Sequence, residues 1–306
     1  PGFRETPAAN RARRSLFHPA CGLMVGMKSG MSSAGYWARV GFAVAVIVFV
    51  SPDRLRAEDF SSVFSDRKLT LVIADSKKDT VHVYNPDRAE KRLTAFSTFK
   101  VAHSLIALDS GAIPDKGFVI PYNEKKYPEY AGGGPGGAWG RDQDLAGALK
   151  HSVVWYYREV SARVGESNYR RYLKAFDYGN QDLSGGLDGF WLNSLEISAL
   201  ELVAFLRKFH RDDLPLKKGV GAEVKEMMFL EEGDDYRLFG KTGTGPKAKD
   251  GTRLGWLAGF VETKENVFVY AFNVRADASD WKAFQANRRR ILRDGFARLG
   301  VTLKWK

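Results

Sequence analysis

Residues 97–111 read STFKVAHSLIALDSG and predict a buried α-helix. Apolar residues recur three to four positions apart, which is the spacing of one helix face. These residues are Val101, Leu105, Ile106 and Leu108. Gly111 follows them, and a glycine at this place typically ends a helix. We therefore expect a helix over Ser97–Asp109 that begins with Ser97 and Lys100, which lie on one face.

The segments around this helix predict an α/β protein. Short runs rich in β-forming residues and bounded by turn residues predict strands at 69–75, 81–85, 236–242, 253–263 and 267–276. Helical spacing recurs at 152–164, 168–176, 195–210, 216–229 and 281–299. This order indicates one antiparallel sheet flanked by the terminal helix, plus a helical subdomain inserted at about 97–230. The glycine-rich stretch 131–140 is expected to be a mobile loop.

The first 57 residues have the composition of a leader. A basic segment precedes the uncharged apolar run Val40–Val50, and Leu55–Ala57 resembles a cleavage site. The apolar run is too short for a membrane span, which takes roughly 17–25 residues. We therefore expect residues 1–57 to be an upstream extension and a cleaved signal peptide. Residues 58–306 would form the folded domain, in the periplasm and without a stable membrane anchor.

Charge and composition disfavour several function classes. The chain carries a net charge of +11, but residues 1–57 hold eight Lys/Arg and two Asp/Glu, which leaves +5 for residues 58–306. So mild an excess does not favour a nucleic-acid partner. Cys21 is the one cysteine and lies in the predicted leader, so no disulfide is expected. The sequence has no HExxH motif, phosphate-binding loop or GxSxG elbow, so neither a metal nor a nucleotide cofactor is expected.

A serine–lysine pair at the start of the buried helix is the main candidate for chemistry. Lys100 lies one turn after Ser97, so its amine can reach the serine hydroxyl. A serine hydroxyl is a poor nucleophile until an adjacent base takes its proton. The same spacing occurs at Ser65–Lys68 and Ser279–Lys282, but neither of these pairs begins a buried helix. We interpret both as chance matches.

Three further motifs accompany the pair. Lys241–Gly243 ends a predicted strand, where a charge, a hydroxyl and a close backbone approach suit a carboxylate ligand. Ser152–Val154 begins a predicted helix, and taken alone it is better explained by an ordinary N-cap serine. Tyr178–Asn180 is equally compatible with a polar turn. The order of all the motifs along one chain is the stronger signal.

Together the motifs resemble those of the class D serine β-lactamases, the oxacillinase type. The matching segments are STFK at 97–100, SxV at 152–154, YGN at 178–180, FWL at 190–192, KTG at 241–243 and WLAG at 256–259. The resemblance covers residues 60–303 and implies the fold of serine β-lactamases and transpeptidases. The YGN element argues against class A, which has an SDN-type loop.

The resemblance implies hydrolysis of the β-lactam ring of penicillin-type antibiotics through a serine acyl-enzyme. Lys100, carbamylated by CO₂ or bicarbonate, would be the general base, because an apolar pocket lowers the pKa of a lysine from about 10.4. The implied catalytic residues are Ser97, Lys100, Ser152 and Lys241. The implied substrate-binding residues are Thr242, Gly243, Thr244 and Arg288, with Arg289 as an alternative to Arg288. The implied carbamate pocket consists of Phe99, Val154, Trp191 and Leu192.

The resemblance also implies an oxyanion hole made of the backbone N–H groups of Ser97 and Thr244. The expected partner is a small β-lactam substrate, and the expected assembly is a monomer or a homodimer. Two other functions share the motifs. One is a penicillin-binding sensor or D,D-peptidase with a long-lived acyl-enzyme, and the other is a non-catalytic envelope-binding module. Val154 and Trp191 near the lysine favour hydrolysis, and the intact polar motifs argue against the module.

Overall fold

The computed structural model describes residues 55–57, 68–134, 137–277, 279 and 281–305. Most of the predicted leader lies outside the described residues. The predicted cleavage site Leu55–Ala57 is described, and it forms strand β1, paired in parallel with Val81–Val83. Removal of the leader stays a prediction.

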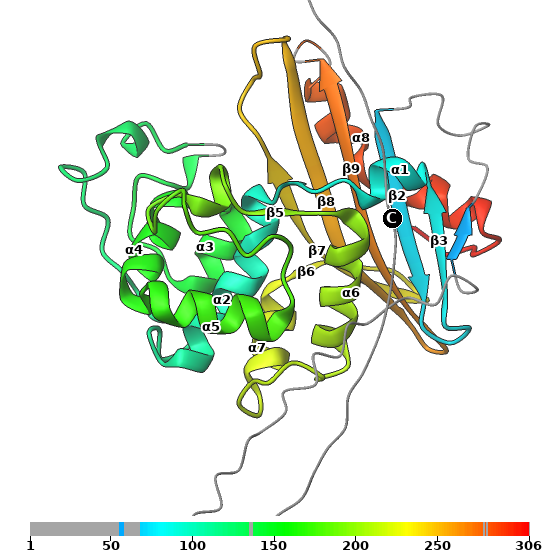
Figure 1. The fold of residues 1–306 in the computed structure, drawn as a ribbon, viewed down its shortest axis with the longest axis horizontal. Coiled ribbons are helices and arrows are strands. Elements are labelled where there is room, and N and C mark those ends of the chain that lie inside the picture. Colours follow the sequence, from blue (N-terminus) through cyan, green and yellow to red (C-terminus); the bar gives the residue numbers. More distant parts are fainter. Residues whose placement is uncertain (1–54, 58–67, 135–136, 278, 280, 306) are drawn as a thin grey trace, which may run out of the picture. The chain divides into compact units, whose positions relative to one another are not determined.

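The described residues form a seven-stranded sheet in the order β1-β3-β2-β9-β8-β7-β6 (Figure 1). Its strands after β1 are β2 (Leu69–Asp75), β3 (Thr80–Tyr84), β6 (Phe229–Glu232), β7 (Tyr236–Thr244), β8 (Thr252–Thr263) and β9 (Val267–Asp277). Apart from the β1–β3 pair, neighbouring strands pair antiparallel. The predicted antiparallel arrangement is therefore confirmed for the strands expected at 69–75 and 81–85 and for the three expected between 236 and 276.

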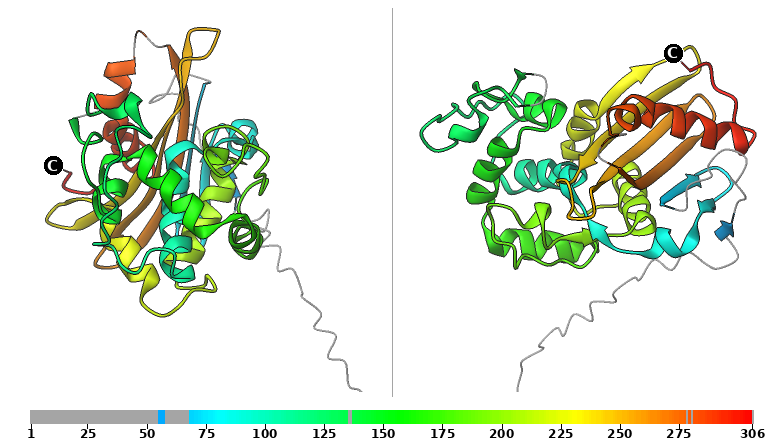
Figure 2. Two further views of the ribbon diagram at one scale, coloured as in Figure 1. Left: turned by 90° about the vertical axis from the view of Figure 1, so that its left-hand side faces the viewer. Right: turned by 90° about the horizontal axis from the view of Figure 1, so that it is seen from above.

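The helices fall into two groups, as Figures 1 and 2 show. The first group lies between the sheet strands in sequence and consists of α1 (Pro86–Glu90), α2 (Lys100–Ser110), α3 (Leu145–His151), α4 (Val154–Val164), α5 (Glu166–Phe176), α6 (Ala199–His210) and α7 (Val220–Met227). Helix α8 (Trp281–Arg298) follows the last strand and covers the opposite face of the sheet. In the described part of the chain, no helix has the length and apolar character that a membrane crossing requires.

Short elements lie between the helices of the first group. A two-stranded sheet joins β4 (Leu93–Thr94) to β5 (Glu196–Ile197). Single 3₁₀ turns lie at η2 (Phe96–Phe99), η3 (Pro128–Tyr130) and η5 (Phe190–Leu192). The turn η2 leads directly into α2 and contacts β7, so the start of the buried helix lies beside the KTG strand.

The sheet buries both of its faces because side chains alternate along each strand. On one face, Ile73 and Phe272 pack with Leu292 of α8. On the other face, Val72 and Phe260 join the core of the helical group. Neighbouring residues of one strand therefore face opposite sides of the sheet. In the KTG segment, Lys241 and Thr242 accordingly lie on different faces of β7.

The boundaries of several predicted helices differ from the structure. The helix expected over 195–210 begins only at Ala199, because Glu196–Ile197 pairs with β4 as strand β5, and the helix expected from Ser97 begins as the 3₁₀ turn η2, with α2 starting at Lys100. The helix expected over 152–164 is wrong at its start, because Ser152 ends α3 and α4 begins at Val154. Helix α3 is capped by Asp144, whose carboxylate accepts a hydrogen bond from Gly147 N, and was not predicted. The helix expected over 216–229 is shorter, because the chain from Phe229 pairs with β7 instead. The predicted glycine stop at Gly111 is confirmed, with φ of 76°.

Candidate active site

Ser97 lies in the turn η2, directly before α2. Phe96 has a φ of 47°, a left-handed value that side chains other than glycine rarely adopt. The Thr98 hydroxyl holds the turn by donating to the Ala95 carbonyl at 2.6 Å. Ser97 is half-buried, and its Oγ lies 3.2 Å from the Lys100 Nζ. The predicted contact between the serine hydroxyl and the lysine amine is therefore present.

Lys100 is fully buried in the first turn of α2. Its Nζ donates to the Ser152 carbonyl at 2.6 Å and lies 3.2 Å from the Ser152 Oγ. Burial, followed by the nearby charge of Lys241, lowers the pKa of Lys100 well below its usual value. The site therefore favours the neutral amine, the form that accepts a proton or adds to an electrophile.

Ser152 occupies a position that the sequence did not predict. It is the C-cap of α3 with φ of 58°, so the expectation that it begins a helix is wrong. The reversal of the chain between α3 and α4 directs both its carbonyl and its hydroxyl to the buried amine. Left-handed backbone at a residue other than glycine costs energy, and such residues persist only where their surroundings hold them.

Lys241 approaches Ser152 from the sheet. Its Nζ donates to the Ser152 Oγ at 3.1 Å and to the Thr242 carbonyl at 3.2 Å. Burial, followed by the charge of Arg288, lowers the pKa of Lys241 to about 7. The Ser152 hydroxyl thus lies between two buried amines, an arrangement that can pass a proton in either direction.

The end of β7 forms an edge of the sheet within the described residues, because β6 pairs with β7 only at 237–239. Gly245 N–H donates to the Leu254 carbonyl of β8. Because such pairs alternate along antiparallel strands, the N–H of Thr244 points away from β8, to the edge. A Cβ at Gly243 would lie 3.2 Å from the Ala95 carbonyl, so glycine allows β7 to approach η2 closely.

Arg288 of α8 completes the cluster, and Arg289 does not. The Arg288 guanidinium is largely buried and donates to the Thr244 hydroxyl at 3.1 Å. Thr242 lies on the same face of β7 as Thr244, by strand alternation. Burial lowers the pKa of Arg288 to about 10, which still leaves it charged at neutral pH. Arg289 is half-exposed and pairs with Glu231.

The four residues expected to form a carbamate pocket differ in burial. Phe99 and Trp191 are fully buried, whereas Val154 and Leu192 are half-buried. The indole N–H of Trp191 is buried and has no hydrogen-bond partner among the described residues. Burying a donor without an acceptor is unfavourable, so this N–H is a candidate for binding a group that is added to the site.

The YGN segment holds the chain next to Trp191 and, within the described residues, makes no hydrogen bond to the reacting groups. Gly179 has φ of 53°, and a Cβ there would lie 2.0 Å from the Glu196 carbonyl. The Asn180 side chain donates to the Ser194 carbonyl at 2.8 Å and accepts from Glu196 N at 2.9 Å. These bonds hold the chain that follows Trp191.

Tyr157 is a site residue that the motif search missed. The Lys100 Nζ lies 5.3 Å from the centre of its ring, and its hydroxyl shares a 2.8 Å hydrogen bond with Ser104. The signal was available in the sequence, because Tyr157 follows Val154 by three residues and so lies on the same face of the helix.

The other candidates do not join the cluster. Of the two chance matches, Ser279 and Lys282 are exposed, and Ser65 lies outside the described residues. No group of three or more His, Cys, Asp and Glu residues within the described ranges is arranged to hold a metal ion.

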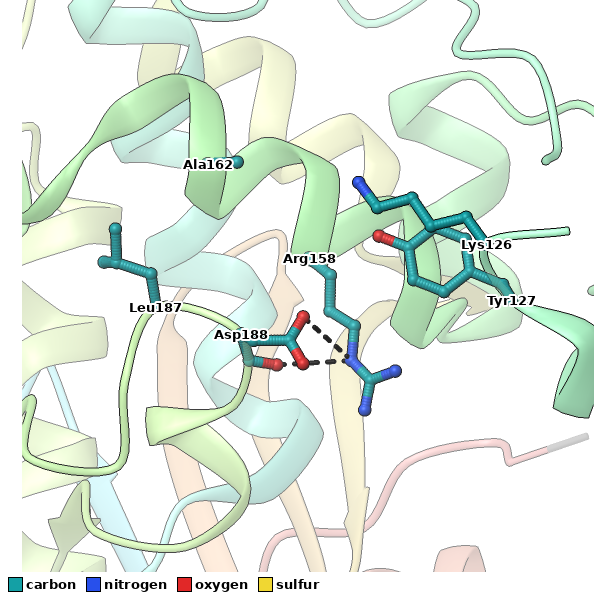
Figure 3. Close-up of a pocket in the computed structure, with 6 residues that line it drawn as sticks. All are labelled: Lys126, Tyr127, Arg158, Ala162, Leu187 and Asp188. Atoms are coloured by element: carbon teal, nitrogen blue, oxygen red, sulfur yellow. Dashed lines mark hydrogen bonds and ion pairs between the residues drawn. The ribbon is translucent and has the colours of Figure 1, made fainter.

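A cavity of about 360 Å³ also lies apart from the cluster, beside α4. It is lined by Lys126, Tyr127, Arg158, Ala162, Leu187 and Asp188 (Figure 3). Arg158 points to Asp188 and forms ion pairs with Asp188 and Glu129. None of the motif residues lines this cavity.

The fold and the serine–lysine cluster together define a class of protein. A family model described as the penicillin binding protein transpeptidase domain matches residues 67–294. This match covers most of the described domain, from β2 to α8, and includes every residue of the cluster.

Comparison with individual proteins shows which branch of this family the chain resembles. The chain is 41% identical over 221 residues to "Probable beta-lactamase YbxI" of Bacillus subtilis (strain 168), covering 72% of this chain and 78% of that protein. A solved class D β-lactamase from Bacillus subtilis superposes with a TM-score of 0.68 at 36% identity, covering 81% of this chain and 98% of that one. The regulatory protein BlaR1 of Bacillus licheniformis is 33% identical over 75% of this chain, but only 37% of BlaR1 is covered. The chain belongs to the class D serine β-lactamases and is a hydrolase of that class.

Proposed function

We propose that the domain hydrolyses penicillin-type β-lactams through an acyl-enzyme on Ser97, with a carbamylated Lys100 as the general base. One observation carries the proposal. A fully buried amine with a lowered pKa lies 3.2 Å from the hydroxyl of a half-buried serine. A serine hydroxyl needs such a base before it can attack a carbonyl carbon.

The residues of the cluster account for the proton movements of ring opening. The Ser97 oxygen bonds to the lactam carbonyl carbon as its proton passes to the base at Lys100. The N–H groups of Ser97 and Thr244 would stabilise the oxygen anion that forms. As the carbon–nitrogen bond breaks, the Ser152 hydroxyl gives its proton to the lactam nitrogen and takes one from Lys241, 3.1 Å away. The base then returns its proton through the Ser152 hydroxyl to Lys241, so that the base is free again. Water attacks the ester carbon as one of its protons passes to the base, and this proton moves to the Ser97 oxygen as the ester C–O bond breaks.

The surroundings of Lys100 fit a carbamate. A neutral amine adds to CO₂ with loss of one proton, and the resulting carboxylate supplies the base. The unpartnered N–H of Trp191 would donate to a carboxylate oxygen. This bond would remove the cost of burying an unsatisfied donor, about 1–3 kcal/mol.

Trp191→Phe tests the carbamate, because phenylalanine keeps an aromatic ring and removes only the N–H donor. We expect the variant to release the acyl group on the order of 10²-fold more slowly than the wild type, and added bicarbonate to restore part of the rate. The measurement is mass spectrometry of protein treated with benzylpenicillin, sampled over time, with and without bicarbonate.

A matched control is Trp305→Phe, since Trp305 packs with the core on the α8 face of the sheet. We expect this variant to release the acyl group as the wild type does. Equal release by wild type and Trp191→Phe, indifferent to bicarbonate, would show that Lys100 acts as a plain amine.

Arg288 is proposed to bind the substrate carboxylate together with Thr242 and Thr244. Arg288→Ala should raise KM for benzylpenicillin roughly 10- to 100-fold, which corresponds to the loss of a charge-assisted hydrogen bond of about 1.5–3 kcal/mol. Arg289→Ala should leave KM unchanged, because that guanidinium pairs with Glu231 instead. Steady-state kinetics of both variants decide between the two arginines. An increase in KM confined to Arg289→Ala would reverse the assignment.

A sensor with a long-lived acyl-enzyme is the alternative function. The similarity to part of the regulatory protein BlaR1 supports it, because this domain also occurs in a relative that is named as a regulator. The time course above separates the two functions. Rapid loss of the penicillin adduct from the wild-type protein supports hydrolysis, and an adduct that lasts for hours supports the sensor.

We also propose that the protein is exported to the periplasm and acts there as a monomer or homodimer. Export is supported by the apolar run and the basic segment in residues 1–57 alone. Amino-terminal sequencing of the periplasmic fraction tests the cleavage, and an uncut leader would contradict it. Light scattering of the purified protein gives the assembly, and a larger oligomer would contradict it.

A further inference from the structure

The two peptide groups on either side of the Ser152 Cα are each held by a side chain. On one side, the Lys100 Nζ donates to the Ser152 carbonyl at 2.6 Å. On the other side, the indole N–H of Trp139 donates to the His151 carbonyl at 2.9 Å. The last carbonyls of a helix have no partner within the helix, so the Trp139 bond satisfies one of these groups in α3.

Trp139 is itself held in place. The backbone N–H of Trp139 donates to the Gly133 carbonyl at 2.7 Å, and the backbone carbonyl of Trp139 accepts from the Trp155 indole N–H at 2.7 Å. Its ring packs against Tyr130 with ring centres 5.1 Å apart. A Cβ at Gly134 would lie 2.5 Å from the Trp139 ring, so the glycine leaves room for the indole. The described residues of the glycine-rich stretch thus hold the Trp139 side chain in one position.

We infer that Trp139 is a positioning residue for Ser152: its bond to the His151 carbonyl helps to hold Ser152 in the left-handed conformation that puts the Ser152 hydroxyl between Lys100 and Lys241. The inference rests on the proposed role of Ser152 in proton transfer. Trp139 acts through the backbone of α3 and need not touch the lactam ring.

The backbone geometry makes this role specific. Ser152 has φ of 58°, and its N–H and that of Val153 bond back to carbonyls of α3. These bonds end the helix but do not involve the His151 carbonyl. Without Trp139, the His151–Ser152 peptide can tilt, and small displacements of a proton-transfer group lower rates strongly.

Trp139→Phe tests the inference, because it keeps an aromatic ring against Tyr130 and removes the N–H donor. We expect the acylation rate constant for benzylpenicillin, from single-turnover kinetics, to fall on the order of 10-fold with little change in the dissociation constant. The same substitution in a Ser152→Ala background should change acylation by less than about 2-fold, because the group that it positions is gone. Tyr130→Phe, which removes one hydroxyl in the same loop, should acylate as the wild type does.

The outcomes separate the possibilities. If Trp139→Phe slows acylation equally in both backgrounds, Trp139 acts on something other than Ser152 and the inference is overturned. If Ser152→Ala itself acylates normally, the proposed role of Ser152 fails instead. Thermal unfolding accompanies each assay, and Trp139→Tyr serves if Trp139→Phe does not fold. A weaker dissociation constant with an unchanged acylation rate would make Trp139 part of the substrate wall and also overturns the inference.

Discussion

Ser97→Ala is expected to lower kcat/KM for a chromogenic cephalosporin by ~10⁴-fold or more, as removal of a catalytic serine does in other serine hydrolases. The reason is chemical, since no other described serine hydroxyl has both a buried lysine amine at 3.2 Å and a place in the turn beside β7. Hydrolysis is followed by absorbance, and adduct formation by mass spectrometry of the same samples. Without the Ser97 oxygen, no penicillin mass should be added to the protein.

Ser279→Ala is the matched control for this variant. Ser279 also precedes a lysine by three residues, but both side chains are exposed. This variant should hydrolyse the cephalosporin at the wild-type rate. Hydrolysis by Ser97→Ala within 10-fold of the wild type, or loss of activity in Ser279→Ala, would reject Ser97 as the nucleophile.

Lys100→Met is expected to lower the rate of hydrolysis by ~10³-fold or more, because methionine fills similar space but can neither accept a proton nor bind CO₂. Both formation and release of the acyl-enzyme should slow, and bicarbonate should have no effect. A variant that acylates and deacylates normally would place the general base elsewhere. The same time-resolved mass spectrometry measures both steps.

The same variant has a second, thermodynamic signature. The pKa of Lys100 is lowered in the folded state, so between that pKa and about 10.5 the unfolded chain binds one more proton than the native protein does. Wild-type stability should therefore rise with pH in this window, by up to about 1.4 kcal/mol per pH unit from this group. In Lys100→Met this contribution is absent, so its stability relative to the wild type should be greatest near neutral pH and should shrink towards pH 10. Urea unfolding at several pH values measures the free energy of unfolding of both proteins. If the two free energies changed in parallel with pH, Lys100 would be charged in the folded protein.

Local patterns were sufficient to predict much of the fold. The helical spacing after Ser97, the glycine stop at Gly111 and the antiparallel strands between 236 and 276 are confirmed. Hydrophobic periodicity reports which face of an element is buried, and glycine marks where a helix can end. The start of α4 was predicted wrongly, since a serine before an apolar run is typical of an N-cap, whereas Ser152 ends α3 instead. Only contacts with Lys100 and Lys241 distinguish the two.

The sequence by itself determined which chemical groups are present and in what order: a serine and a lysine one turn apart, a second serine, a KTG segment and an arginine on the last helix. The tertiary structure decided how they meet. It placed Arg288 rather than Arg289 beside Thr244, and it directed Ser152 to two amines that lie 52 and 89 residues away in the chain. It also lowered the pKa of both lysines, through desolvation. The physical reason is that burial and charge–charge distance are properties of packing between distant segments, and no local pattern of residues records them.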